Sequence, residues 1–176
     1  MTLNRRYRYV GPAEIRDQAV AVDTVAVDSA DTLARWLAEP KRTEPKRTER
    51  KRAEQKRAEQ KQAEPNEPVT FVVLLALARG QDVLAAGEMT FGPAGSRWRV
   101  VEVTNQSTGY CPDPDCWPAV RTALDQLGIR HPGDFTEKVV FRLCPSCGER
   151  NIVRDGDFTC ALCDSGLPAR WNFTPA

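Results

Sequence analysis

The stretch CPSCGERNIVRDGDFTCALCDSG, residues 144–166, decides how the C-terminal part of this chain folds. It contains two Cys-x-x-Cys pairs, Cys144 with Cys147 and Cys160 with Cys163, and twelve residues separate the pairs. Two residues between cysteines allow one tight turn to direct both sulfurs at one ion. Four thiolates in a tetrahedron are the arrangement that structural zinc prefers. The spacing therefore predicts a four-cysteine site that holds one structural zinc ion.

The residues between the two pairs predict a β-hairpin. A short β-prone run at residues 151–153 precedes Asp155 and Gly156, which are a strong two-residue turn signal, and the return strand starts at Phe158. Two cysteine turns joined by a hairpin are the layout of a zinc ribbon, and residues 139–173 closely resemble that family. The resemblance implies that the four cysteines are the metal ligands.

Charge is divided unevenly along the chain. The 176 residues carry a formal net charge of +1, but residues 41–65 contain ten Lys or Arg and five Glu, which leaves +5 there. The remaining 15 basic and 19 acidic residues leave −4. The foldable part is therefore mildly acidic, and its bulk charge does not indicate a nucleic-acid partner.

Residues 41–65 are five tandem pentads: KRTEP, KRTER, KRAEQ, KRAEQ and KQAEP. A repeat of five residues advances by about 140° per repeat on an α-helix, so no apolar stripe can form. We therefore interpret residues 41–68 as a charged linker that is disordered or transiently helical. The alternative is a basic tether for nucleic acid or an anionic surface, although the interspersed glutamates dilute its charge.

The sequence on either side of this linker predicts an α+β fold with a small antiparallel sheet and one or two flanking helices. Three successive strands with short turns indicate an antiparallel meander. We expect the second strand to be broken at residues 85–87 and the next turn to occupy residues 92–95. The expected elements are a helix at 27–39 with Ser29 as its N-cap, strands at 69–78, 83–91 and 98–103, and a helix that Asp113 and Asp115 precede and Gly128 ends.

These assignments divide the chain into four parts. The parts are residues 1–40 and 69–137, which together form the α+β domain, residues 41–68, which form the linker, and residues 138–176, which form the zinc ribbon. We also expect Trp171 and Phe173 to pack back on the ribbon or the sheet, because an exposed aromatic pair near a terminus is unusual.

Six cysteines occur in a chain whose N-terminus has the charges of a secretion signal but lacks its apolar stretch. The longest apolar run, residues 69–78, is about half of the ~20 residues that a membrane helix requires. We therefore expect a cytoplasmic protein without a membrane partner, in which the cysteines remain thiols available to metal rather than disulfides.

A second place where chemistry could occur is the junction of residues 105–116, which joins the end of a strand to the start of a helix. Free backbone N–H groups and the helix dipole could hold an anionic ligand there. The alternative is a stiff connection that is hydrogen-bonded internally and whose aspartates cap the helix. The side chains that would bind a small ligand are Asn105, Ser107, Thr108 and Tyr110.

Cys111 and Cys116, with His131 downstream, could begin a second metal site or supply a thiolate nucleophile and a base. No neighbouring motif supplies a fourth metal ligand, and a single histidine in the chain gives little support for acid–base catalysis. The chain also lacks the common phosphate-binding, dinucleotide-binding and zinc-protease motifs. The sequence therefore leaves enzyme activity uncertain and leans against it.

Residues 81–173 as a whole resemble an uncharacterised family of bacterial proteins. The matching stretches are VLAAGE (83–88), WRVVEVTNQSTGYCP (98–112), WPAV (117–120) and the cysteine-rich segment, together with the opening YRYVGP (7–12). The combination of AGE with NQSxGY also resembles modules of bacterial effector and toxin proteins. The resemblance implies the fold and the metal site, and it supplies no established activity.

Three functions follow, in the order in which the sequence favours them. The first is a non-enzymatic interaction module that a structural zinc stabilises and whose partner is another protein. The second is a small-ligand or enzymatic site at residues 105–116. The third is nucleic-acid binding through the ribbon and the basic linker, although residues 137–176 carry five basic and five acidic side chains and so lack the expected electrostatic footprint.

Overall fold

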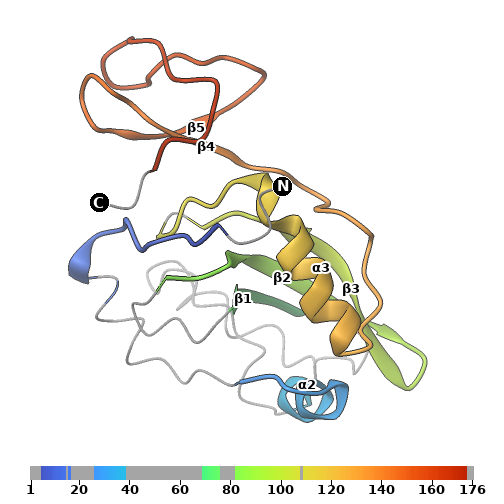
Figure 1. The fold of residues 1–176 in the computed structure, drawn as a ribbon. Helices are drawn as coiled ribbons and strands as arrows, with labels where there is room; N and C mark the ends of the chain where they lie inside the picture. Colours follow the sequence, from blue (N-terminus) through green and yellow to red (C-terminus); the bar gives the residue numbers. More distant parts are fainter. Residues whose placement is uncertain are drawn as a thin grey trace, which may run out of the picture.

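A computed structural model of the chain describes residues 5–14, 16, 26–38, 69–75, 82–107 and 109–173. Within these residues the protein is an α+β structure with two α-helices and two small antiparallel sheets, as the sequence predicts (Figure 1). The linker predicted at residues 41–68 lies outside them. The elements are α2 (Ala30–Leu37), β1 (Val69–Leu75), β2 (Ala85–Ala94), β3 (Arg97–Thr104), the 3-10 helix η1 (Pro114–Cys116), α3 (Trp117–Gln126), β4 (Val140–Leu143) and β5 (Arg150–Val153).

The larger sheet is the predicted meander, with strand order β1-β2-β3 and antiparallel pairing throughout. The break expected at residues 85–87 is wrong, because these residues pair with β1 and belong to β2. The expected turn at residues 92–95 is also too early. β2 continues to Ala94, and the chain turns at Gly95 and Ser96, where Gly95 has a φ of +67°.

Residues 85–87 have low β-propensity, yet they form part of β2, and Gly87 allows this part of the strand to lie very close to β3. A Cβ at this position would overlap the carbonyl oxygen of Thr104 and would stand 3.1 Å from the Cα of Asn105, and both are backbone atoms. β2 and the end of β3 can therefore approach this closely only because residue 87 is glycine. Pairing and burial override intrinsic propensity at this point.

Gly87→Ala is expected to destabilise the protein by about 1–3 kcal/mol, because backbone atoms of β3 would have to move to admit the methyl group. Thermal unfolding followed by circular dichroism would measure this as a lower Tm. Gly166→Ala is the matched control, since a Cβ there would meet no atom within 4 Å. Equal Tm values for the two variants would contradict the proposed close approach.

The two predicted helices are present, but α2 is shorter than the expected 27–39, because it begins after the Ser29 cap and ends at Leu37. The Ser29 side chain caps α2 by accepting a hydrogen bond from the N–H of Thr32 at 3.1 Å. Asp113 caps η1 by accepting the N–H of Asp115 at 3.0 Å, and α3 follows η1 directly. Gly128, with a φ of +66°, follows the last turn of α3. Neither helix is long and apolar enough to cross a membrane, and this finding covers the described residues only.

The main apolar core lies between the sheet, the two helices and the N-terminal segment. Tyr7 is 1% exposed and forms an isolated antiparallel bridge with Val83, so the N-terminal segment is joined to the chain just before β2. α3 lies against the sheet (Figure 1), and its apolar side chains belong to this core. The buried side chains of α3 are Trp117, Val120 and Leu124.

A second apolar cluster joins the C-terminal lobe to the rest of the molecule. Its buried members are Cys111, Val139, Phe141 and Phe173, and Trp171 packs against them. The Trp171 ring also meets Tyr7 edge to face, with 5.3 Å between ring centroids. The prediction that Trp171 and Phe173 pack back onto the protein is therefore confirmed, and the lobe with β4 and β5 lies at one end of the molecule (Figure 1).

Candidate metal centre

The four cysteines predicted as metal ligands meet in the C-terminal lobe. Their sulfur atoms all lie within 4.8 Å of one another. The Cys144 and Cys163 sulfurs are 3.6 Å apart, and those of Cys147 and Cys160 are also 3.6 Å apart. Sulfurs placed about 2.3 Å from a tetrahedral zinc ion would be about 3.8 Å from each other. The cluster could therefore hold a metal ion of this size without a large rearrangement.

The strand pairing that supports this cluster differs from the predicted hairpin. β5 pairs with β4 across the first cysteine turn, with Phe141 opposite Ile152. The expected return strand at Phe158 is absent from the described residues, and the Asp155-Gly156 turn is closed by a single bridge between Arg154 and Asp157. Phe141 of β4 is buried in the apolar cluster that joins the lobe to the sheet, so tertiary packing supports the pairing of β4 with β5.

The two cysteine turns have the same backbone hydrogen bonds. The N–H of Cys144 donates to the carbonyl of Glu149 at 2.8 Å, and the N–H of Cys160 donates to that of Ser165 at 2.8 Å. The residue after each second cysteine has a positive φ, 76° at Gly148 and 57° at Asp164. Aspartate tolerates the left-handed region better than most residues, so the second turn repeats the first without glycine.

Asn151 ties the two turns together, and sequence reasoning missed this role. Its side chain is 95% buried. The amide nitrogen donates to the Glu149 carbonyl at 2.9 Å and lies 3.6 Å from the Cys160 sulfur, while the amide oxygen accepts the N–H of Ala161 at 2.9 Å. A hydrogen bond of this kind orients a ligand sulfur and stabilises its negative charge. The one signal in the sequence is a polar asparagine at the start of the short β-prone run.

Hydrogen bonds to sulfur favour the thiolate form that metals bind. The N–H groups of Leu162 and Cys163 lower the pKa of the Cys160 thiol to about 6, and the hydroxyl and N–H of Ser165 lower the pKa of Cys163. At Cys147 the Glu149 N–H acts in the same direction, but desolvation and the other three sulfurs raise the pKa to about 12. Four thiolates this close together require a cation that compensates their charge.

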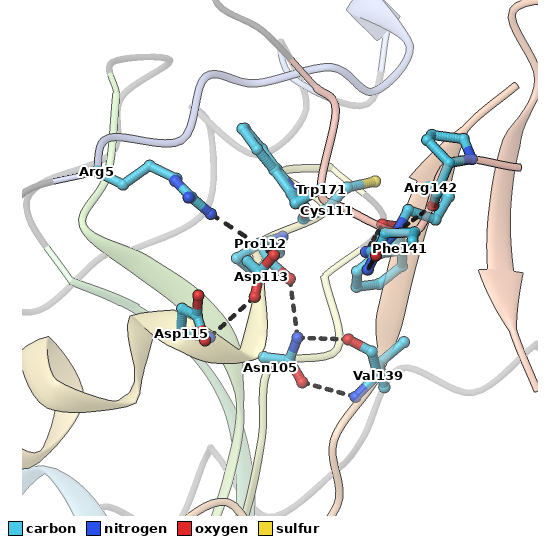
Figure 2. Close-up of polar contacts among 12 residues, drawn as sticks. Arg5, Asn105, Cys111, Pro112, Asp113, Asp115, Val139, Phe141, Arg142 and Trp171 are labelled. Carbon is cyan, nitrogen blue, oxygen red and sulfur yellow. Dashed lines mark hydrogen bonds and ion pairs between the residues drawn. The ribbon is translucent and has the colours of Figure 1, made fainter. Parts of the chain in front are cut away.

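The junction of residues 105–116 lies beside this lobe, and its first residue, Asn105, is fully buried. The Asn105 amide nitrogen donates to the carbonyls of Pro112 at 2.8 Å and Val139 at 2.7 Å, and its oxygen accepts the N–H of Val139 at 2.8 Å (Figure 2). Asn105 therefore links the end of β3 to the strand that enters the C-terminal lobe. Its polar atoms contact protein backbone.

Of the other residues predicted to bind a ligand at this junction, the structure describes Ser107 and Tyr110. Tyr110 is 5% exposed, and its ring meets that of Tyr9 edge to face at 5.3 Å between centroids. The Ser107 carbonyl accepts the N–H of Cys111 at 2.6 Å and so closes the loop on itself, and Thr108 lies outside the described residues. The cavity at the start of the helix measures about 10 Å³, enough for one water molecule. This geometry favours the internally hydrogen-bonded connection.

Cys111, Cys116 and His131 occupy three separate environments. Cys111 packs in the apolar cluster under the lobe, and burial raises its thiol pKa to about 11. Burial and the charge of Asp113 raise the pKa of Cys116 to about 12. The Nε2 atom of His131 lies 3.1 Å from an Asp125 carboxylate oxygen. Among the described residues, only the four cysteines of the C-terminal lobe form a group that could hold a metal ion.

No family model, curated protein or solved structure matches this chain. The resemblance to an uncharacterised bacterial family and to effector and toxin modules therefore stays a prediction that rests on the quoted motifs. The structure nevertheless explains those motifs physically. The glycine of AGE permits the close approach of β2 to β3, and the asparagine of NQSxGY links β3 to the C-terminal lobe.

Proposed function

We propose that this protein is a non-enzymatic interaction module whose C-terminal zinc ribbon is held together by one structural zinc ion. The observation that carries the proposal is the meeting of four sulfurs from two similar turns within 4.8 Å of one another, with two of the pairs 3.6 Å apart. Thiolates are the ligands that select zinc and iron–sulfur sites, and a pair of Cys-x-x-Cys turns around one position suits zinc. The ligands are Cys144, Cys147, Cys160 and Cys163.

A structural role for the metal follows from the number of protein ligands. Catalytic zinc keeps one coordination position open for water or substrate, whereas four cysteines close the coordination sphere. The thiols outside the ribbon offer no alternative nucleophile, because the raised pKa values of Cys111 and Cys116 keep both protonated at neutral pH. These properties support a binding module rather than an enzyme.

The metal would also supply much of the stability of the ribbon. The apolar cluster inside the distal part of the lobe has three buried members, Cys144, Cys160 and Leu167, and two of them are metal ligands. So small a core cannot offset the entropy of ordering the chain. Metal binding contributes on the order of 10 kcal/mol in small zinc domains, which is enough to fold the lobe.

The nucleic-acid alternative receives little support from the ribbon. The Arg142 guanidinium is buried and donates to the carbonyls of Phe141, Pro168 and Ala169 at 2.7–3.0 Å. Arg150 donates to the Val10 carbonyl at 3.0 Å. Two of the five basic side chains of residues 137–176 are therefore directed at the protein itself, which leaves a more acidic outer surface. We accordingly propose a protein partner, and a reducing cytoplasm as the compartment that keeps the thiols free for zinc.

Full-length protein purified without chelator is expected to contain one zinc ion per chain by inductively coupled plasma mass spectrometry. Thiol modification with an organomercurial should release that ion stoichiometrically, because all four ligands are thiolates. Substitution by Co²⁺ should produce the intense visible absorption of tetrahedral thiolate coordination. Protein without bound metal would contradict the proposal, and protein that contains iron would contradict the assignment of zinc.

A further inference from the structure

The two cysteine turns present exposed apolar side chains at the far end of the ribbon. Leu162 is 68% exposed, whereas Ile152, the other exposed large hydrophobic residue among those described, is 39% exposed. Pro145 and Ala161 are also exposed, and each lies between the two cysteines of its turn. The sulfurs of both turns lie within 4.8 Å of one another, so the turns stand side by side. We call Pro145, Ala161 and Leu162 the knuckle surface.

A single exposed leucine is common on protein surfaces, but the backbone around Leu162 is held by hydrogen bonds on both sides. The N–H of the preceding residue, Ala161, donates to the side-chain oxygen of Asn151 at 2.9 Å. The N–H of Asp164 donates to the Cys160 carbonyl at 3.0 Å. The ribbon core takes Leu167 instead, which is 8% exposed. A preorganised turn loses little entropy when a partner covers its side chain, so this leucine is well placed for binding.

The segment that carries the knuckle surface is acidic. Within residues 144–166 the four carboxylates are Glu149, Asp155, Asp157 and Asp164; all are exposed, and none takes part in an ion pair with another described residue. Two basic residues, Arg150 and Arg154, lie in the same stretch, and Arg150 donates a hydrogen bond to the Val10 carbonyl in the N-terminal segment, so the stretch carries a net charge of −2. The zinc centre of the proposed function, with four thiolates and one divalent ion, would add a further net charge of about −2.

We propose that the knuckle surface binds a protein segment in which an apolar side chain is flanked by Lys or Arg. Leu162 supplies the apolar contact, and Glu149 and Asp164, which border the two turns, face the basic residues of the partner. Charge complementarity of this kind directs association and selects the partner, while burial of the apolar side chain supplies affinity. Phosphate groups would be repelled by the same carboxylates. This inference rests on the proposed zinc-stabilised module and names the chemistry of its partner.

The test measures binding of the zinc-loaded full chain to a short fluorescent peptide in which two leucines are flanked by lysines. Fluorescence anisotropy is recorded at near-physiological salt, and a peptide with glutamates in place of the lysines serves for comparison. The lysine peptide is expected to bind. Leu162→Ser is expected to weaken it by about tenfold or more, since a buried leucine contributes that much to binding.

Two further variants separate this surface from general attraction between opposite charges. Ile152→Ser removes an exposed apolar side chain from β5 and is expected to leave the affinity unchanged. Glu102→Gln removes a carboxylate from a groove of about 310 Å³ on the sheet, where Glu88 and Glu137 also lie. This change is likewise expected to leave the affinity unchanged. Asp164→Asn removes a negative charge beside the second turn and keeps a residue that tolerates positive φ. It should weaken binding of the lysine peptide and reduce the dependence of that binding on salt.

The proposal is overturned if the lysine peptide does not bind, if Leu162→Ser binds as tightly as the unchanged chain, or if the glutamate peptide binds equally well. Tighter binding of a single-stranded oligonucleotide than of the lysine peptide would also overturn it. Zinc content is measured on each sample. A zinc-loaded protein that fails to bind contradicts only this inference, whereas a protein without zinc contradicts the proposed function itself.

Discussion

Replacement of Cys144 by serine is expected to abolish zinc binding and to unfold the C-terminal lobe, while the three-stranded sheet stays folded. Cys144 is 1% exposed, and its sulfur lies 3.6 Å from that of Cys163. A serine hydroxyl is a poor ligand for zinc among thiolates, so the binding free energy, on the order of 10 kcal/mol in small zinc domains, would be largely lost. The sheet has a separate core and does not depend on this ion.

Zinc content and residue-resolved hydrogen exchange would together measure this effect. Amides of β5 and of both cysteine turns should exchange much faster in Cys144→Ser, while those of β2 and β3 keep their protection. Cys111→Ser is the matched control, because it alters a buried thiol outside the cluster and should retain one zinc. Full zinc occupancy in Cys144→Ser, or equal loss of protection in the sheet, would contradict the expectation.

Asn105→Ala is expected to destabilise the protein by about 3–5 kcal/mol. The change leaves two buried carbonyls, of Pro112 and Val139, and the N–H of Val139 without the partners that they have now. Each buried polar group that loses its partner costs about 1–3 kcal/mol, and the effects at one site are not fully additive. The loss should fall on the connection between β3 and the C-terminal lobe.

Urea unfolding of the zinc-loaded protein would give this free energy, with Gln106→Ala as the control at the exposed neighbouring position. Limited proteolysis should also cut near residues 136–139 more readily in Asn105→Ala, because Val139 is no longer bound to β3. A loss below about 1 kcal/mol would contradict a structural role for Asn105 and would revive the interpretation of the junction as a ligand site.

The parts of this fold that depend on near neighbours in the chain could be predicted from the sequence. The Ser29 cap, the antiparallel meander and the helix that follows Asp113 were all indicated by residues close to them. The same is true of the cysteine turns, since two residues between cysteines restrict how the backbone can run. The spacing of the cysteines alone selected the four sulfurs that lie within 4.8 Å of one another.

Features that depend on contacts between distant segments could not be predicted. β5 pairs with β4, and Phe141 of β4 is buried in the apolar cluster that joins the C-terminal lobe to the sheet. Likewise, Ala85 and Ala86 appear poorly suited to a strand until the neighbouring strands bury them. The intrinsic β-propensity of a residue contributes less to the stability of a strand than the burial and pairing that tertiary structure provides.

The junction of residues 105–116 shows this division most clearly. Its polar and turn-forming composition was visible in the sequence and was compatible with either a ligand site or a stiff connection. Asn105 and Val139 are 34 positions apart, and only the folded chain brings their polar atoms within 2.8 Å. The sequence by itself determined the chemistry of the metal ligands, because that chemistry lies in residue type and spacing. Tertiary structure alone decided what the polar side chains of the junction bind, because buried hydrogen-bonding groups take the partners that folding places beside them.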